Sequence, residues 1–487
     1  MTTGTLIILI ILCYFSLLLI ISHRISRKSS DNEAFFLGNR QSPWYVVAIG
    51  MIGTSISGVT FISVPGWVRG IDMTYMQMVF GFFFGYLLIA YVLLPLYYKL
   101  RLTTIYEYLQ QRFGNVSYKT GASFFLLSRV VSSAVRLYLV AMILQSIVFA
   151  RWHIPFPVTV VGIMLLIWAY TFRSGVKTII WTDLLQTLCF LLAIVLIFWQ
   201  VSVRMDGGFA GAVSYVAHSP HFRIFVFDDW GSRQHFLKQF LSGIFIVVVM
   251  SGLDQDIMQK NLTCKSLKEA RKNMLSYGFA FIPLNFALLC LGILLLGFAD
   301  KFGIALPAVS DQILPMLATE YLGFPVLIFF TIGIIAAAFA SADSSLASLT
   351  TSVCVDLLNV KQKPEKEAKR LRMNVHFGVN VLFVLVILVI DYIGQDSVID
   401  AIYTIVSYTY GPLLGLFAFG LFTKRQVRDR LVPYVAVASP LLCYALERFL
   451  LAEYNYRVGY ELLMLNGFLT FVGLRLLRMK KIPKYEN

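Results

Sequence analysis

The strongest constraint on this chain is a series of apolar segments that follow one another almost from end to end. A helix of about 20 apolar residues spans the hydrocarbon layer of a membrane. We expect thirteen such spans, at residues 4–22, 44–68, 73–98, 119–149, 155–172, 178–203, 236–257, 273–299, 324–357, 373–393, 398–422, 431–450 and 459–477. Because 58% of the residues are hydrophobic and only 14% are charged, a water-soluble fold could not bury this apolar surface. The sequence therefore predicts an all-α, polytopic membrane protein whose first segment is a retained span rather than a cleaved signal peptide.

Lysine and arginine concentrate in every second loop, and this predicts the orientation in the membrane. The basic loops read "HRISRK", "KLRLTTIYEYLQQRFG", "RSGVK", "KNLTCKSLKEARK", "KQKPEKEAKRLR" and "TKRQVRDR", and the tail contains "RLLRMKKIPK". Because such loops stay in the cytoplasm, we expect the N-terminus outside, the C-terminus inside and residues 204–235 in an extracellular loop with a short helix. The net charge of +15 follows from this bias, so we expect no nucleic-acid partner.

The predicted chain is one transmembrane domain, residues 1–487, with internal symmetry. It comprises an extra N-terminal helix at 4–22, a core region at 44–257 and 273–422, and two C-terminal helices at 431–477. In the two halves of the core, spans 44–68 and 236–257 hold equivalent positions, and each is interrupted, in "GMIGTSISGVTF" and in "VMSGLDQD". Paired interruptions indicate a transporter binding site near the membrane midplane. The alternative, that the glycines only permit close helix packing, remains open.

Span 324–357 carries a polar stripe along one side of its helix. The stripe consists of Ala337, Ala340, Ser341, Ser344, Ser345 and Ser348. Hydroxyls and exposed carbonyls are hard oxygen ligands, which suit a dehydrated alkali cation. An intramembrane carboxylate costs about 3 kcal/mol, so Asp343 indicates a function unless an arginine or lysine pairs with it. Asp183 is either a helix cap or a second carboxylate for the same cation.

Five segments together resemble the signatures of the sodium/solute symporter family: "LPLYYKLRLTTIYEYLQQRFG", "WTDLLQ", "GLDQDIMQKNLTCKSLKEA", "SADSSL" and "YTYGPLLGLF". They occur in the family's order and spacing over nearly the whole chain. The family includes sodium–sugar, sodium–proline, sodium–iodide, sodium–vitamin and sodium–sialic acid cotransporters. The resemblance implies a leucine-transporter-type 5+5 inverted repeat, with sodium and solute beside the two interrupted spans.

The resemblance also implies two cation sites. The core sodium site maps onto Gly53, Ile56, Ala337, Ala340 and Ser341. At Ala340 many relatives carry a hydroxyl residue, so this chain lacks one side-chain ligand there. A second cation site, present in some relatives, maps onto Asp183, Asp343, Ser344 and Ser345. Two carboxylates there would suit either a second Na⁺ or a coupled H⁺, and both remain open.

The expected solute site combines hydroxyls, an arginine and aromatic rings. It comprises Ser55, Ser57, Thr60, Gln77, Arg136, Phe245 and Tyr403. Ser57 and Thr60 match the positions with which the sialic acid branch of the family holds a carboxylate. A guanidinium facing a cavity would select a carboxylate, although Arg136 could instead reach an interface or pair with a gate residue.

These observations predict a sodium-coupled symporter of the cell (inner) membrane. Its expected solute is a small carboxylate-bearing molecule, such as a sialic acid or another acidic sugar, and a neutral sugar or polyol is the alternative. A channel, a uniporter or a transporter-like sensor on the same fold represents another class. No nucleophile–base pair or phosphate-binding loop stands out, so we expect no catalytic residues and no enzyme. The expected partners are the solute, Na⁺ and the lipid bilayer, and the family expectation is a functional monomer.

Overall fold

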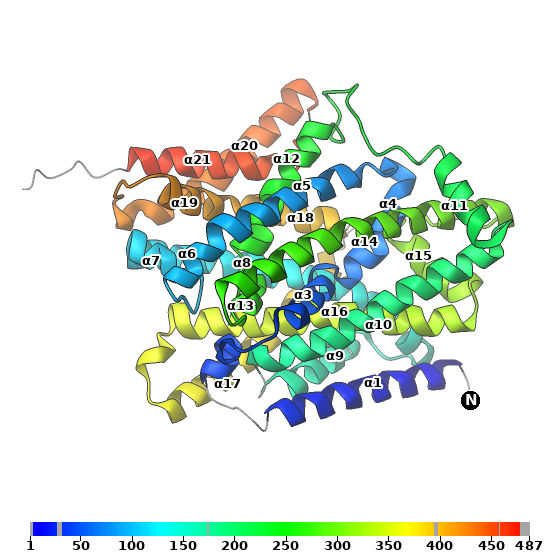
Figure 1. The fold of residues 1–487 in the computed structure, drawn as a ribbon, viewed down its shortest axis with the longest axis horizontal. Helices are drawn as coiled ribbons and strands as arrows, with labels where there is room; N and C mark the ends of the chain where they lie inside the picture. The colour runs from blue at the N-terminus through cyan, green and yellow to red at the C-terminus, as the bar shows by residue number, and fades with distance from the viewer. Residues whose placement is uncertain (1–2, 27–31, 173–174, 394–397, 457, 478–487) are drawn as a thin grey trace, which may run out of the picture.

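The structure is a computed structural model that describes residues 3–26, 32–172, 175–393, 398–456 and 458–477. Helices make up its core and its periphery (Figure 1). The principal helices are α1 (Thr3–Ser26), α3 (Trp44–Ser55), α4 (Gly58–Ile71), α5 (Tyr75–Leu88), α8 (Asn115–Leu144), α9 (Phe156–Thr171), α10 (Gly175–Arg204), α11 (Gly208–His218), α12 (Phe236–Val247), α13 (Gln255–Asn261), α14 (Leu267–Phe302), α16 (Phe324–Ser352), α17 (Glu365–Ile393), α18 (Val398–Thr409), α19 (Gly411–Phe422), α20 (Val432–Tyr454) and α21 (Leu462–Leu476).

The apolar segments of the sequence fold into helices of three kinds. Among the described residues, 7 helices are long and apolar enough to cross a membrane. Three further pairs are bent by more than 40°: α3 with α4 (57°), α12 with α13 (67°) and α18 with α19 (43°). Shorter apolar helices cover Ile11–Arg24, Phe156–Thr171 and Leu462–Leu476. The all-helical membrane class predicted from the apolar pattern is therefore confirmed.

The first predicted interruption is confirmed at the junction of α3 and α4. Ile56 and Ser57 leave the helical conformation, with φ/ψ angles of −84°/72° and −62°/168°. The last backbone bond before the break runs from the Ile56 amide to the Ile52 carbonyl, and the next runs from the Phe61 amide to the Ser57 carbonyl. The carbonyls of residues 53–56 thus lie where the helical ladder is interrupted, and none of them accepts a backbone hydrogen bond from the described residues, so they can bind a ligand.

The second predicted interruption is also confirmed, and the structure adds a third that was not predicted. After α12 the chain forms a π-helical turn, η5 (Val248–Gly252), and Asp254 then caps α13 by accepting from the Asp256 amide at 2.8 Å. The third bend lies at Tyr410, between α18 and α19. It falls inside the predicted span 398–422, directly before Gly411 and Pro412, and this glycine–proline pair favours a helix break at that point.

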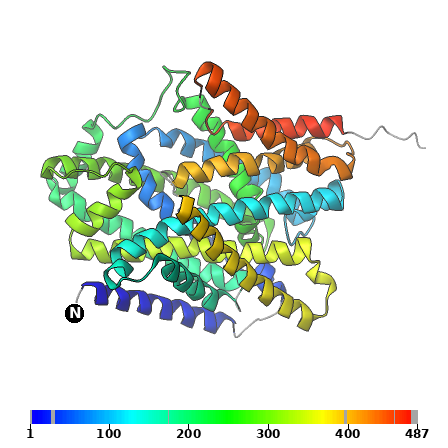
Figure 2. The same ribbon diagram turned by 180° about the vertical axis from the view of Figure 1, so that it is seen from behind.

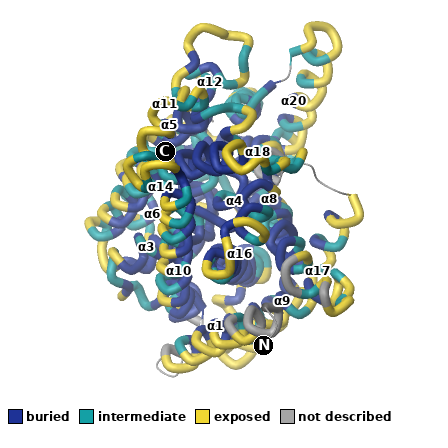
Figure 3. Tube along the Cα trace, turned by 90° about the vertical axis from the view of Figure 1, so that its right-hand side faces the viewer, coloured by how far each residue is buried: buried dark blue, intermediate teal, exposed yellow. Residues whose placement is uncertain are grey.

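The helices pack around a buried centre. α10 contacts α16 and α3, while α8 contacts α16, α17 and α18. Helix α1 lies along one edge of the molecule, and α20 and α21 lie along the opposite edge (Figures 1 and 2). Buried residues gather in the middle, on α4, α8 and α16, and exposed residues lie toward the outside (Figure 3). This arrangement places the bent helices, with their free backbone groups, away from lipid, as a membrane fold requires.

Candidate functional site

A cavity lies between the bent helices at the centre of the protein. It contains about 710 Å³ of space not filled by atoms, part of it open to solvent. Its lining includes Ser55, Ser57, Thr60, Tyr75, Arg129, Arg136, Met250, Tyr277 and Tyr403. Five of the seven predicted solute-site residues therefore face one space: Ser55, Ser57, Thr60, Arg136 and Tyr403. They come from α3, α4, α8 and α18 and from the break itself, which no single stretch of sequence could show.

Three of the lining groups have unused hydrogen-bonding capacity. Arg136 forms no hydrogen bond or ion pair with any residue in the described part of the chain. The hydroxyls of Ser57 and Thr60 likewise have no hydrogen-bond partner among the described residues. A guanidinium presents five donors, and leaving them unpaired away from bulk water is unfavourable. The cavity therefore offers a positive charge and two hydroxyls to an incoming anion.

Gln77 and Phe245 do not line the cavity. The Gln77 side chain is buried and donates to the Gln234 carbonyl at 2.9 Å, and its oxygen accepts from the Val226 amide at 3.1 Å. It therefore fastens the segment between α11 and α12 to α5. Phe245 is partly buried and packs against the hydrophobic core. Tyr75 and Tyr403 do line the cavity, and their hydroxyl oxygens lie 3.2 Å apart.

The residues matched to the core sodium site lie on elements in direct contact. α16 packs against both α3 and α4. A Cβ atom added to Gly58, just after the break, would lie 3.3 Å from the Ile334 carbonyl oxygen on α16. Gly53 and Ile56 lie in the stretch with free carbonyls, and Ala337, Ala340 and Ser341 are buried on α16. Backbone carbonyl oxygens and the Ser341 hydroxyl are hard donors, which suit Na⁺.

The residues matched to the second cation site fall into two separate hydrogen-bond networks. Asp343 accepts from the Tyr170 hydroxyl at 3.0 Å and from the Ser344 hydroxyl at 3.3 Å. The Ser345 hydroxyl instead accepts from Arg129 at 3.0 Å and from Ser133 at 2.9 Å. Because Ser345 also donates to the Ser341 carbonyl at 2.8 Å, both of its lone pairs and its proton are already in use.

Asp183 has a cationic partner that sequence reasoning missed. It lies in the interior of α10, which begins at Gly175, so it does not cap that helix. The Lys260 ammonium donates to the Asp183 carboxylate at 2.5 Å and to the Thr54 hydroxyl at 2.5 Å. Both charged side chains are buried, with 3% and 0% of their surface exposed. Lys260 belongs to the segment "GLDQDIMQK". Its place directly after an interrupted span was the only feature of the sequence that could have indicated an ion pair with Asp183.

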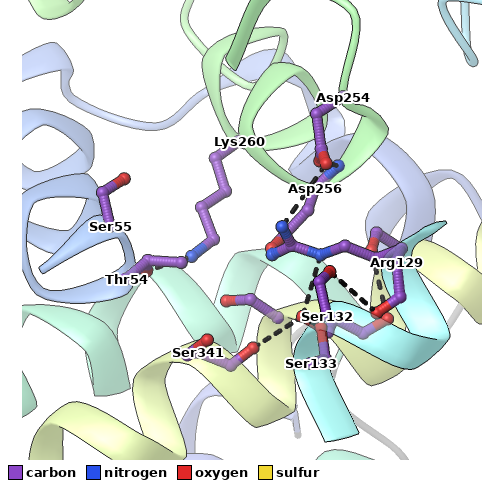
Figure 4. Close-up of polar contacts among 12 residues, drawn as sticks. Thr54, Ser55, Arg129, Ser132, Ser133, Asp254, Asp256, Lys260 and Ser341 are labelled. Atoms are coloured by element: carbon purple, nitrogen blue, oxygen red, sulfur yellow. Dashed lines mark hydrogen bonds and ion pairs between the residues drawn. The ribbon is translucent and has the colours of Figure 1, made fainter. Parts of the chain in front are cut away.

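A second buried ion cluster joins Arg129 on α8 to Asp254 and Asp256 at the start of α13 (Figure 4). Arg129 pairs with Asp254 at 3.4 Å and with Asp256, and the side chains are 1–3% exposed. The Tyr410 hydroxyl also donates to Asp254. The sequence showed Arg129 inside a span and two aspartates beside an interruption, but nothing local indicated that they meet.

Comparisons with known proteins identify the family. The model of the sodium:solute symporter family matches residues 35–429. This chain belongs to the sodium:solute symporter family. The symporter is therefore a membrane transporter rather than an enzyme, and Na⁺ is its coupling ion.

Two relatives and one solved structure resemble the symporter over most of its length. The sodium/sialic acid symporter SiaT of Proteus mirabilis (strain HI4320) is 25% identical over 422 residues, which are 85% of this chain and 84% of that protein. The sodium/sialic acid symporter NanT of Aliivibrio fischeri (strain ATCC 700601 / ES114) is 23% identical over 476 residues, 96% of this chain and 93% of that protein. A substrate-bound, outward-open structure of a Na⁺-coupled sialic acid symporter matches with a TM-score of 0.83 at 21% identity, over 98% of both chains. The symporter thus shares the fold of that transporter.

Proposed function

We propose that the symporter imports a small carboxylate-bearing solute, a sialic acid or another acidic sugar, together with Na⁺. The observation that carries this proposal is Arg136, an arginine that lines the central cavity and has no partner among the described residues. Ser57 and Thr60 add hydroxyls from the first bent span. A carboxylate can accept two parallel hydrogen bonds from a guanidinium, which fixes both its charge and its orientation. The names of the two relatives, both sialic acid symporters, support the same solute class.

We further propose that the coupling Na⁺ binds to the carbonyls of Gly53, Ile56 and Ala337 and to the Ser341 hydroxyl, with Ala340 beside it. The interrupted helical ladder supports this assignment, because it leaves carbonyl oxygens without amide partners. The sodium gradient then drives accumulation of the solute by alternating access around the fixed site.

The proposed topology has thirteen crossings in one domain, residues 1–487, with the N-terminus outside, the C-terminus inside and a 5+5 inverted repeat between the terminal helices. The seven long helices, three bent pairs and three shorter apolar helices support this count. The basic loops support the orientation and a location in the inner cell membrane. We propose that one copy, surrounded by lipid, is sufficient for transport.

Uptake into proteoliposomes tests the solute class. Radiolabelled N-acetylneuraminic acid should accumulate under an imposed Na⁺ gradient and not when K⁺ replaces Na⁺, while its uncharged methyl ester should not accumulate. Arg136→Gln should lower uptake at sub-saturating solute about 30-fold, because a charge-assisted hydrogen bond contributes about 2 kcal/mol. Arg223→Gln is the matched control, because Arg223 lies in an exposed loop. Uptake of the ester or of a neutral sugar would contradict the carboxylate site, and solute flow without any ion gradient would indicate a uniporter.

A further inference from the structure

Two of the three bends in the described part of the protein meet at Arg129 on α8. Asp254 and Asp256 belong to the bend between η5 and α13, and both pair with Arg129. Tyr410, at the bend between α18 and α19, donates to Asp254. The neighbouring Thr409 donates to Ser128 on α8 at 2.7 Å. Arg129 therefore joins α8 to two remote segments of the chain, each at the point where its helix changes direction.

This cluster adjoins the cavity through one of its members. Arg129 contributes to the cavity lining, as does Arg136, which lies two helical turns, about 10 Å, further along α8. The proposed topology places the N-terminal end of α8 at the cytoplasm, so Arg129 lies on the cytoplasmic side of Arg136. Side chains of the cluster are 1–3% exposed, so the ion pairs lie in a layer that solvent does not reach.

The same arginine touches the helix that carries the proposed sodium site. Its Nε donates to the Ser345 hydroxyl at 3.0 Å, and Ser345 donates to the Ser341 carbonyl at 2.8 Å. The chain of hydrogen bonds thus runs from Ser341, through Ser345, to Arg129. From Arg129 it continues to Asp254 and Asp256 (Figure 4). Any displacement of α16 when Na⁺ leaves Ser341 changes the geometry at Ser345 and removes a hydrogen bond from the guanidinium.

We propose that Arg129, Asp254 and Asp256 form the cytoplasmic gate of the cavity and that Ser345 couples this gate to Na⁺ at Ser341. The inference rests on the proposed function for the sodium position and the orientation. Sodium at Ser341 holds α16 in place, so Ser345 orients Arg129 and the gate stays closed. After Na⁺ leaves, the ion pairs separate and α13 moves away from α8.

The physical chemistry of a buried ion cluster suits a gate better than a structural tie. Desolvation of the charges offsets most of their mutual attraction, so such a pair adds little net stability. A gate also has to lie where helices can change direction, and this ion cluster lies at two bent helix pairs and not between unbroken helices such as α10 and α14. In the proposal, Na⁺ binds the state with the closed gate more tightly than the state with the open gate. This difference in affinity shifts the equilibrium toward the closed gate.

Cysteine accessibility tests the gate. Met250→Cys places a reporter thiol in the cavity lining, and modification of this thiol is followed by peptide mass spectrometry, which separates it from the native cysteines. A membrane-impermeant maleimide is added to the cytoplasmic face of inside-out vesicles. The Met250→Cys protein serves as the parent for the other variants. In this parent, Na⁺ should slow the modification at least about fivefold. Arg129→Gln, introduced into the parent, should be modified about fivefold faster in Na⁺, because the gate no longer closes.

Ser345→Ala tests the coupling separately from the gate. This variant should still gain thermal stability from Na⁺, but Na⁺ should no longer slow modification of the reporter thiol. Ser348→Ala is the matched control, because Ser348 lies on the same stripe and donates only to the Ser345 backbone carbonyl at 3.1 Å. It should behave as the parent. If Na⁺ protects Ser345→Ala as well as the parent, the coupling is wrong.

The remaining outcomes separate the gate from the sodium assignment. Parent-like modification of Arg129→Gln overturns the gate. If that variant fails to fold, Tyr410→Phe replaces it: it keeps every charge, loses one bond to Asp254 and should be modified faster than the parent. If Na⁺ fails to stabilise the parent, the proposed sodium site is wrong, while faster modification of Arg129→Gln than of the parent in the same Na⁺ buffer still supports the gate.

Discussion

At the scale of single residues, the most informative side chain is the buried Lys260. Its ammonium lies between the Asp183 carboxylate and the Thr54 hydroxyl, and the Thr54 hydroxyl itself lies 3.2 Å from that carboxylate. A lysine is rarely buried without a partner, and an aspartate even less so inside a membrane. Each residue therefore compensates the charge of the other, and neither can be removed alone at low cost.

Lys260→Met should destabilise the protein by about 3–5 kcal/mol, because it leaves the Asp183 charge buried and uncompensated. The double variant Lys260→Met with Asp183→Asn should recover most of that loss. Thermal unfolding in detergent, measured for both single variants and the double variant, gives the coupling energy directly. Additive losses would mean that the two side chains do not depend on each other.

Ser341→Ala should weaken the apparent affinity for Na⁺ roughly tenfold, equivalent to about 1.4 kcal/mol. The hydroxyl is the one side-chain oxygen among the positions matched to the core site, since Ala340 contributes none. The midpoint of Na⁺-dependent thermal stabilisation measures the effect, and Ser348→Ala provides a matched serine on the same helix. An unchanged midpoint would place the ion elsewhere.

At the scale of elements, small residues bring α3 and α10 close together. A Cβ atom added to Gly53 would overlap the Thr187 hydroxyl, and one added to Gly50 would lie 3.0 Å from the Asp183 Cβ. This close approach positions Asp183 beside Thr54. Glycine at these positions therefore has a packing role in addition to the carbonyl that Gly53 offers to sodium.

Gly53→Ala should cost about 1–3 kcal/mol of stability through overpacking against Thr187. Gly162→Ala on α9 is the control, because a Cβ there meets nothing within 4 Å; it should be neutral or stabilising by about 0.5–1 kcal/mol. Thermal unfolding compares the two. Equal behaviour of both variants would show that α3 and α10 can separate without penalty.

At the scale of the whole molecule, the orientation in the membrane is open to a direct test. Ala210 in α11 and Lys366 in the first turn of α17 are both exposed. A membrane-impermeant maleimide should label Ala210→Cys in intact cells and Lys366→Cys only after permeabilisation, because basic loops stay in the cytoplasm. Labelling in the reverse pattern would invert the proposed topology, and with it the cytoplasmic side of the Arg129 gate.

Much of the architecture was already determined by the sequence alone. The apolar segments predicted the helices, and the interruptions at residues 50–61 and 249–256 predicted two of the three bends, because span length and helix breaking are local properties. Ser57 and Thr60, which were matched by family resemblance, and Arg136, which was predicted as the carboxylate-binding arginine, are brought to one cavity by the fold. The bend at Tyr410 was not predicted, although Gly411 and Pro412 directly after it are a local helix-breaking signal.

The tertiary structure decided which polar side chains meet. It paired Lys260 with Asp183 and Arg129 with Asp254 and Asp256, and it turned Gln77 toward the loop after α11 instead of the cavity. A helical pattern specifies where a residue lies along its own helix. Its partners depend on how distant helices pack and rotate against one another, and those contacts between remote segments cannot be deduced from the periodicity of any one span.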